Sequence, residues 1–427
     1  MTGQLALPLR PAAAGPLVGR SGKEHTPRFK WGVLGIGIAA QAAFSAAFQG
    51  LPTSGPLLQD AYRLTPSQLG LVLAAVTCGA FATDVFWGLA ADRIGERKVL
   101  VTGLTGTTLA LAAATLFLTP AAGAVPSYAA LAVVLFLAGC LGGSVNGASG
   151  RAVMGWFPVE QRGFAISLRV AAVPAGGAIG AAVLPPLALN GGFRWVFGFL
   201  TACSLLAALA VVRWLDEPPL PAARGRAAAP QAPNPLRRKD IWRVAGTAFL
   251  LDLPQFTVLT FGSVFLHTVE HVPLGTVAAL LVVVQVLSAV SRVWGGRWTD
   301  RRGGRHRRTL VTVYSWTIAA GFTATALLES GPSWLVAALL AASGVLACGW
   351  HGVHYAEIAT MAGAERAGAA LGLENTLVFA GAFVTPLLIP AVLSASSWPV
   401  VMLLVGALPA VLSALLMPRE PKPPARA

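Results

Sequence analysis

Apolar stretches of about 20 residues follow one another along most of the chain, separated by short segments rich in charge, proline or glycine. A helix of about 20 residues, rising 1.5 Å per residue, crosses the roughly 30 Å hydrocarbon core of a bilayer. Strands of a transmembrane barrel would instead alternate in hydrophobicity over about ten residues, and no such alternation appears. The pattern predicts an all-α membrane protein with twelve transmembrane helices, near residues 31–58, 69–91, 99–119, 128–154, 164–189, 193–214, 242–265, 274–294, 309–328, 334–360, 367–392 and 398–417.

The polar segments divide these spans into two groups of six. We expect a disordered cytoplasmic tail at 1–30, a six-helix bundle at 31–215, a cytoplasmic linker at 216–240, a second six-helix bundle at 241–417 and a cytoplasmic tail at 418–427. The linker is rich in proline and arginine, so it cannot bury a core of its own. The spans are rich in alanine and glycine, which let helices approach closely in lipid.

The composition supports a lipid environment. The chain is 55% hydrophobic and 11% charged, with a mean hydropathy of +0.68. A soluble protein of this composition lacks the polar groups to cover its surface. The four cysteines all fall within predicted spans, where we interpret them as small packing residues. No nucleophile–base set and no phosphate-binding loop is visible, so the sequence does not predict an enzyme, a cofactor or a metal site.

The basic residues predict the orientation. With both termini assigned to the cytoplasm, 26 of the 31 lysines and arginines lie in cytoplasmic segments, whereas the outer segments hold Arg63 and Arg194. This is the positive-inside bias of membrane proteins. It also accounts for the net charge of +14, which therefore does not require a nucleic-acid partner. We expect a multi-pass protein of the plasma membrane, monomeric, with membrane lipid and a small-molecule substrate as its partners.

Two polar loops repeat each other. Residues 88–98 read GLAADRIGERK and residues 296–305 read GRWTDRRGGR, with glycine, aspartate, arginine, glycine and arginine at one constant offset. A second match aligns the fifth span with the eleventh. Together these matches indicate a duplicated six-helix unit.

The first of these loops resembles the signature loop of the major facilitator superfamily, and residues 157–163 (FPVEQRG) fit the same family. The resemblance covers residues 31–417. It implies two pseudo-symmetric six-helix bundles, secondary transport by alternating access, and a latch that closes the cytoplasmic side when the transporter faces outward. The candidate latch residues are Gly88, Asp92, Arg93, Gly95, Arg97, Lys98 and Arg151, and in the second copy Asp300, Arg301 and Arg305, with Glu357 as a further partner. The alternative is a solvated loop that only sets topology.

Ionisable and polar residues inside the spans are the candidate transport residues, because a charge in lipid is costly and usually functional. They are Asp252, Gln255, Gln41, Arg169, Arg292, Asp84, Glu374, His351, His354 and Asn146. Asp252, near the middle of the seventh span, is the leading candidate for proton coupling, because burial penalises its charged form. The alternative is a carboxylate bonded to backbone groups that Pro254 leaves free.

The other polar residues also have two interpretations. Gln41 and Gln255 are candidate substrate contacts or interhelical hydrogen bonds. His351 and His354 are titratable cavity residues or satisfied interior histidines. A metal site of these two histidines with Glu357 lacks enough ligands.

The repeat also relates the charges to one another. It makes Asp84 equivalent to Arg292, and Arg169 equivalent to Glu374. In the family fold spans 2 and 11 meet, as do spans 5 and 8, so one seam would carry two carboxylates and the other two arginines. Close carboxylates favour a transferable proton, and two arginines suit an anion. Alternatively, Asp84–Arg169 and Arg292–Glu374 are structural ion pairs within their own halves.

These residues favour proton-coupled uptake of a small organic solute, an anion in particular. Proton-driven efflux is the alternative, although residues 173–180 (VPAGGAIG) lack the Gly-Pro step of such antiporters. Nitrate transport is disfavoured, because Asp84 stands where nitrate porters have an arginine. A receptor or scaffold that transports nothing is the alternative from another class, and substitution of Asp252 would leave its activity intact.

Overall fold

The structure is a computed structural model that describes residues 17–18, 22–121, 124–157, 159–217, 237–362 and 367–420. In that part of the chain, eleven helices are long and apolar enough to cross a membrane. One of them, α7 (Val159–Trp214), has 56 residues and is too long for a single crossing, since a helix of that length spans about 84 Å. It turns at Gly192, which has a φ of 66°, so α7 supplies two spans and the described chain crosses twelve times.

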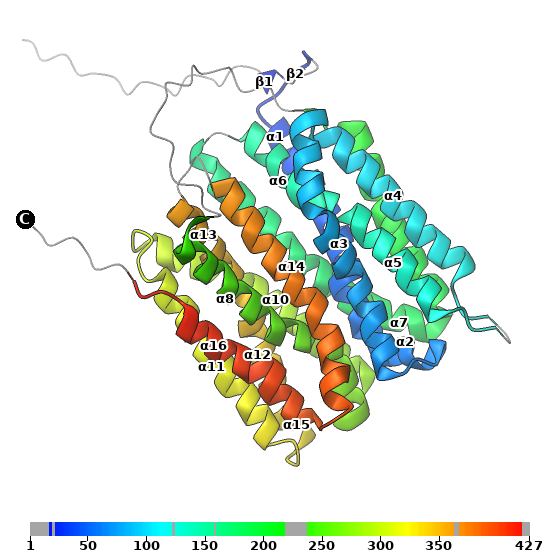
Figure 1. Ribbon diagram of the computed structural model, residues 1–427. Coiled ribbons are helices and arrows are strands. Elements are labelled where there is room, and N and C mark those ends of the chain that lie inside the picture. The colour runs from blue at the N-terminus through cyan, green and yellow to red at the C-terminus, as the bar shows by residue number, and fades with distance from the viewer. Residues whose placement is uncertain are drawn as a thin grey trace, which may run out of the picture.

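The first bundle is formed by α1–α7 and the second by α8–α16 (Figure 1, blue to green and green to red). The first contains α1 (Phe29–Ser45), α2 (Gly55–Tyr62), α3 (Pro66–Ile94), α4 (Glu96–Phe117), α5 (Tyr128–Gly142), α6 (Ser144–Trp156) and α7. The second contains α8 (Lys239–Phe256), α9 (Gly262–Val264), α10 (Leu274–Asp300), α11 (Arg307–Leu327), α12 (Ser333–Gly349), α13 (His351–Ala362), α14 (Ala367–Leu393), α15 (Trp398–Val401) and α16 (Leu408–Leu416).

Corresponding spans of the two bundles are interrupted in similar ways. The first span contains a π-helical turn, η1 (Ala46–Gly50), and a 3₁₀ turn, η2 (Leu51–Ser54). The seventh contains the π-helical turns η4 (Thr257–Phe261) and η5 (Phe265–Val269). The fourth span is divided into α5 and α6, and the tenth into α12 and α13; a further π-helical turn, η6 (Met402–Ala407), lies between α15 and α16. Irregular turns of this kind are tolerated in membranes where they are buried in protein or line a cavity.

The two ends of the molecule differ in charge. We call the end that carries Gly95, Glu217, His306 and Met417 the linker end, and the end that carries Arg63, Gly192, Pro273 and Ser397 the hairpin end. Among the described residues, the basic side chains at the hairpin end are Arg63 and Arg194, and the other basic residues outside the span interiors lie at the linker end. The described part of the N-terminal tail also lies at this end.

Part of the predicted disordered tail is ordered. Two short strands, β1 (Leu17–Val18) and β2 (Glu24–His25), pair antiparallel. The imidazole of His25 lies 2.9 Å from a carboxylate oxygen of Asp216 and stacks on Phe29. The tail is therefore ordered from Glu24 onward because aromatic packing attaches it to the first bundle. Residues 1–16, 19–21, 218–236 and 421–427, which hold most of the predicted tails and linker, lie outside the described residues.

The bundles share one hydrophobic core at the hairpin end. This core joins residues of the first bundle, such as Leu58 and Phe193, to residues of the second, such as Phe261 and Ile389. Towards the linker end, the core of the first bundle is made only of its own residues, between Val33 and Leu215. The two bundles therefore pack together most closely on the hairpin side.

Glycines make the closest helix contacts. A Cβ on Gly180 of α7 would lie 2.5 Å from the Cα of Gly50, which no real side chain tolerates. Gly70 of α3 lies in the same way against the Pro386 carbonyl of α14. The seams predicted between spans 5 and 8 and between spans 2 and 11 are both present, as α7 against α10 and α3 against α14.

Candidate functional site

Arg169 anchors a polar network inside the first bundle. Its Nε–H donates to Ser149 at 2.8 Å, and its Nη2 donates to Gln41 at 2.9 Å. Nη2 also donates to the backbone carbonyls of Val145 and Asn146. All four acceptors are neutral, so α1, α6 and α7 are tied together around a charge that has no direct carboxylate partner among the described residues.

Asp84 joins this network through an amide. The Asn146 side chain donates to Asp84 at 3.3 Å, while the backbone carbonyl of Asn146 accepts from Arg169. The structure thus brings Gln41, Asp84, Asn146 and Arg169 together, with Asn146 bonded to both Asp84 and Arg169. Ser149 belongs to the same group, and the sequence analysis missed it because a serine in an apolar span has no distinctive signal.

Arg292 of α10 is buried, with 6% of its surface exposed. Its Nε–H donates to the backbone carbonyl of Cys348 at 2.7 Å. Its two terminal nitrogens make no hydrogen bond to any described residue, and it forms no salt bridge with Glu374. The alternative of an Arg292–Glu374 ion pair is not formed in this conformation, because the carboxylate of Glu374 pairs with another residue.

That residue is His354 of α13. Its Nδ1 lies 2.5 Å from Oε1 of Glu374, and its Nε2 lies 2.8 Å from the hydroxyl of Thr247 on α8. All three residues are fully buried. The chain Thr247–His354–Glu374 therefore connects α8, α13 and α14 at the centre of the second bundle.

Asp252 lies on α8 beside the backbone of α14. Gly381 makes this approach possible, since a Cβ there would lie 2.9 Å from the Cβ of Asp252. Neither carboxylate oxygen makes an ordinary hydrogen bond to a described residue, and the nearest basic group is Nε2 of His351 at 3.9 Å. The His351 ring stacks on Trp350 at 3.9 Å between centroids. The backbone group that contacts Asp252 is that of Ala382 on α14, and not one of the groups that Pro254 leaves free on α8.

Tyr355 lies where the two clusters converge. Its hydroxyl donates to Asn375 at 2.6 Å. It interacts electrostatically with Arg169 and Asp84 of the first bundle, and with Arg292, Asp252 and Glu374 of the second. The sequence did not single out Tyr355 or Asn375 as candidates. Tyr355 follows His351 by four residues, and this spacing places His351 and Tyr355 on one helix face.

The remaining predicted polar contact is Gln255, which is buried one turn beyond Asp252 and whose Oε1 has no partner among the described residues. Two other glutamines were missed. Gln285 of α10 donates to Gln49 of the first span at 3.3 Å, directly between the bundles. No group of three or more histidine, cysteine, aspartate or glutamate side chains in the described chain is placed to hold a metal ion.

The hydrogen bonds that join the bundles lie at mid-depth or on the hairpin side. Ser263 of α9 donates to the carbonyl of Pro52 at 2.8 Å, and the Gln285–Gln49 bond lies on the same side. Thr77 of α3 also faces the Ala382 carbonyl of α14 at 3.4 Å. Within the described chain, no comparable bond joins the bundles near the linker end.

The loops with latch residues make contacts within their own bundles. Gly95 has a φ of 92° and separates α3 from α4, and Arg97 donates to the Val212 carbonyl at 2.6 Å. The Asp92 and Arg151 side chains lie outside the described residues. Gly88 lies within α3. Arg93 on α3 and Lys98 on α4 are exposed.

The second loop pairs differently from the prediction. Asp300 pairs with Arg307 at 2.9 Å, and Glu357 pairs with Arg308 at 2.6 Å. The predicted partners Arg301 and Arg305 form no salt bridge among the described residues. The reason is geometric. Arg307 and Arg308 are the first residues of α11, and after the turn their side chains reach Asp300 of α10 and Glu357 of α13.

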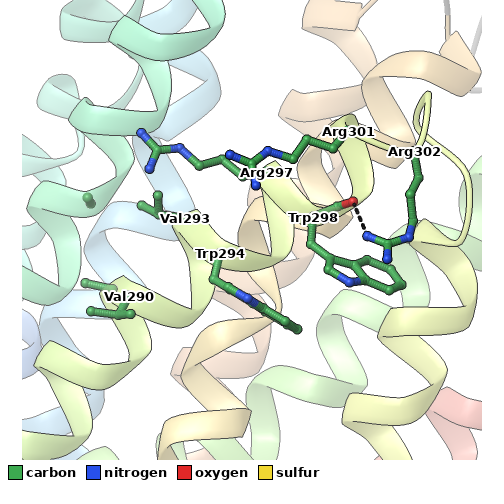
Figure 2. Close-up of a pocket in the computed structure, with 9 residues that line it drawn as sticks. Val290, Val293, Trp294, Arg297, Trp298, Arg301 and Arg302 are labelled. Carbon is green, nitrogen blue, oxygen red and sulfur yellow. Dashed lines mark hydrogen bonds between the residues drawn. The ribbon is translucent and has the colours of Figure 1, made fainter.

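A separate cavity of about 620 Å³ lies along the outer face of α10, beside α7. Figure 2 shows Arg297 and Arg301 reaching along it and Arg302 covering the ring of Trp298. Val290 and Trp294, which line it, are 58% and 54% exposed. This face is opposite to Arg292, so the cavity lies outside the polar clusters.

The comparisons with known proteins agree with this architecture. The model of the Major Facilitator Superfamily matches residues 37–354. An uncharacterized MFS-type transporter of Mycobacterium tuberculosis is 31% identical over 381 residues, covering 89% of this chain and 83% of the relative. A hexuronate transporter of Bacillus subtilis is 22% identical over 306 residues, covering 67% and 71%. The crystal structure of a D-xylose–proton symporter superposes with a TM-score of 0.75 at 16% identity, covering 91% and 97%.

Proposed function

Because the chain belongs to the major facilitator superfamily, with the twelve-helix, two-bundle fold predicted from its sequence, we propose that it takes up a small organic anion together with a proton by alternating access. The observation that supports an anionic substrate is the guanidinium group of Arg292. It is buried, it interacts with Tyr355 in the centre of the protein, and its terminal nitrogens make no hydrogen bond to a described residue.

A guanidinium taken largely out of bulk water must recover its solvation from hydrogen bonds or counter-charges. The Nε–H of Arg292 is bonded to a carbonyl, and its terminal nitrogens are available to a ligand. Two terminal N–H groups in one plane match the two oxygens of a carboxylate. Arg169 differs, since four neutral acceptors already hold it. We therefore assign anion binding to Arg292 of the second bundle. Arg169 of the first bundle remains a positive charge held by its own hydrogen bonds.

A sequence relative with a named substrate supports the same class. The Bacillus subtilis protein is named for hexuronate, which is a sugar acid with one carboxylate. This name supports an organic anion as substrate and does not specify which one. Tyr355, Asn375 and Gln255 are the neutral polar groups available to contact the rest of such a molecule.

We infer that the linker end faces the cytoplasm, because it carries most of the basic residues. With the bundles packed together on the hairpin side, the described conformation then corresponds to an inward-facing state, and both termini are cytoplasmic. The contacts of Asp300 and Arg97 within their own bundles are consistent with a latch that is released in this state. We assign the protein to the plasma membrane.

Thermal stability of the purified protein tests the substrate class. Samples in nanodiscs are heated with D-glucuronate and other small carboxylates, with neutral sugars, or with lipophilic cations. A ligand of the folded state at 100 times its Kd adds about 2.7 kcal/mol of stability, which raises the midpoint measurably. Stabilisation by carboxylates, followed by uptake into proteoliposomes, is the expected result. Stabilisation by lipophilic cations alone would overturn anion uptake and favour proton-driven efflux.

A further inference from the structure

The hydrogen bonds around His354 determine where its protons are. The hydroxyl of Thr247 lies 2.7 Å from the backbone carbonyl of Val244, and a carbonyl can only accept. Threonine has one O–H, so this proton is used on Val244. The oxygen of Thr247 can then only accept from Nε2 of His354, 2.8 Å away. Nε2 of His354 therefore carries a proton.

The other ring nitrogen then decides the charge of the pair. Nδ1 lies 2.5 Å from Oε1 of Glu374. A neutral imidazole that is protonated on Nε2 presents a lone pair at Nδ1, and this lone pair would face a carboxylate oxygen with no hydrogen between them. A contact of that length requires a proton. The pair is either imidazolium with carboxylate or imidazole with carboxylic acid, and both forms have zero net charge and one shared proton.

Loss of this proton leaves a negative charge without compensation. His354, Glu374 and Thr247 have no exposed surface, and Oε2 of Glu374 has no hydrogen-bond partner among the described residues. The His354 ring packs in a T-shaped arrangement with Trp350, with 5.1 Å between the ring centroids. An uncompensated carboxylate in these surroundings is strongly disfavoured, so the packed state favours the loaded pair.

Other titratable and charged groups surround the pair on the neighbouring helices. They are Asp252 on α8, Arg292 on α10, Tyr314 and Arg308 on α11, His351, Tyr355 and Glu357 on α13, and Asp84 on α3. Among these, Tyr355 interacts electrostatically with both Glu374 and Arg292.

We propose that His354 and Glu374 form the binding site of the coupling proton, with Thr247 as the positioning residue that holds the His354 tautomer. The coupling of this proton to transport rests on the proposed function. The shared proton itself rests on the hydrogen bonds alone. Arg292 binds the anion, and the neutral His354–Glu374 pair leaves its positive charge available to that anion. Release of the proton leaves a negative charge in the same bundle as Arg292, which lowers the affinity of this bundle's interior for an anion.

Nitrogen NMR of the histidines tests the shared proton without any substrate. The full-length protein is labelled with [¹⁵N]histidine in nanodiscs, and His354→Gln identifies the signals of His354 among the six histidines. We expect a protonated Nε2 and a strongly hydrogen-bonded Nδ1. Thr247→Val, which keeps the shape and removes the hydroxyl, shifts these signals, and Thr247→Ser restores them. A His354 with an unprotonated Nε2, or signals that Glu374→Gln does not change, overturns the proposal.

Proteoliposomes test the coupling. With D-glucuronate as probe and an inward proton gradient, Glu374→Gln should lose accumulation above equilibrium while exchange of labelled for unlabelled glucuronate continues. Glu329→Gln, a matched substitution at the hairpin end, should keep both. Accumulation that persists in Glu374→Gln contradicts the coupling role. A wild-type protein that moves no glucuronate counts against the proposed substrate class, and the NMR result then decides the proton site separately.

Discussion

The Nε2 atom of His351 lies 3.9 Å from Oδ1 of Asp252, although both side chains are buried and neither oxygen of Asp252 has an ordinary hydrogen bond to a described residue. This distance is too long for a hydrogen bond. It leaves a carboxylate that the surrounding protein does not satisfy. Such a group destabilises the folded state, so we expect it to have a role other than structure.

Asp252→Asn should therefore keep or raise stability while it removes transport. The amide has nearly the same shape and cannot carry the buried charge, so we expect an unchanged or higher melting midpoint. Uptake of the substrate into proteoliposomes should fall at least about tenfold, which corresponds to roughly 1.4 kcal/mol. Transport at the wild-type rate would contradict a role of Asp252 in the pathway, and would be the result expected of a scaffold.

Arg292→Ala should remove anion binding. Hydrogen bonds to a charged group contribute about 1.5–3 kcal/mol each, so loss of two bonds weakens binding by at least about 100-fold. Arg292→Lys should recover part of this affinity, because it keeps the charge and loses the planar pair of donors. The measurement is ligand-induced stabilisation by the carboxylate that the wild type binds.

Arg297→Ala provides the matched control for Arg292. This arginine lies on the same helix but lines the cavity on the outer face, away from the polar clusters. Its substitution should leave carboxylate stabilisation unchanged. Equal losses in both variants would show that the effect of Arg292 is a general effect of charge on the protein.

A disulfide across the hairpin end should stop the transport cycle. A Cβ on Gly55 would lie 3.2 Å from Oγ of Ser263 in the other bundle. This places the two Cβ atoms near the separation of about 3.5–4.5 Å that a disulfide requires. Gly55→Cys with Ser263→Cys should cross-link under mild oxidation and abolish uptake, and reductant should restore it. Each single substitution is its own control, and undiminished uptake by the cross-linked protein would rule out opening at this end.

Gly180→Ala should destabilise the first bundle, because a Cβ there would lie 2.5 Å from the Cα of Gly50. Overpacking of this kind costs about 1–3 kcal/mol. Gly35→Ala is the matched control in α1, where nothing lies within 4 Å of the added Cβ. Alanine is the better helix former by about 1 kcal/mol, so the control should be neutral or more stable. Thermal unfolding in the same lipid distinguishes the two.

Much of the architecture follows from local composition. Runs of about 20 apolar residues predict spans one by one, since the length that crosses a bilayer is a property of each segment. The loop at Asp92 predicted the major facilitator superfamily, and the family comparison confirmed it. The turn in α7 was also predicted as a boundary between spans, at 189–193, because Asn190 and two glycines interrupt the apolar run.

The partners of the buried polar groups came only from tertiary structure. The sequence left open whether Arg292 pairs with Glu374. In the structure Glu374 bonds to His354, and the Tyr355–Asn375 pair had no distinct signal in the sequence. The reason is physical. A span that is apolar on every side has no amphipathic face to fix its rotation, so the neighbours of an inward side chain depend on helix packing. The sequence by itself determined that charges are buried at these depths; only the packing of α8, α10, α13 and α14 decided which of them bind one another and which remain available to a ligand.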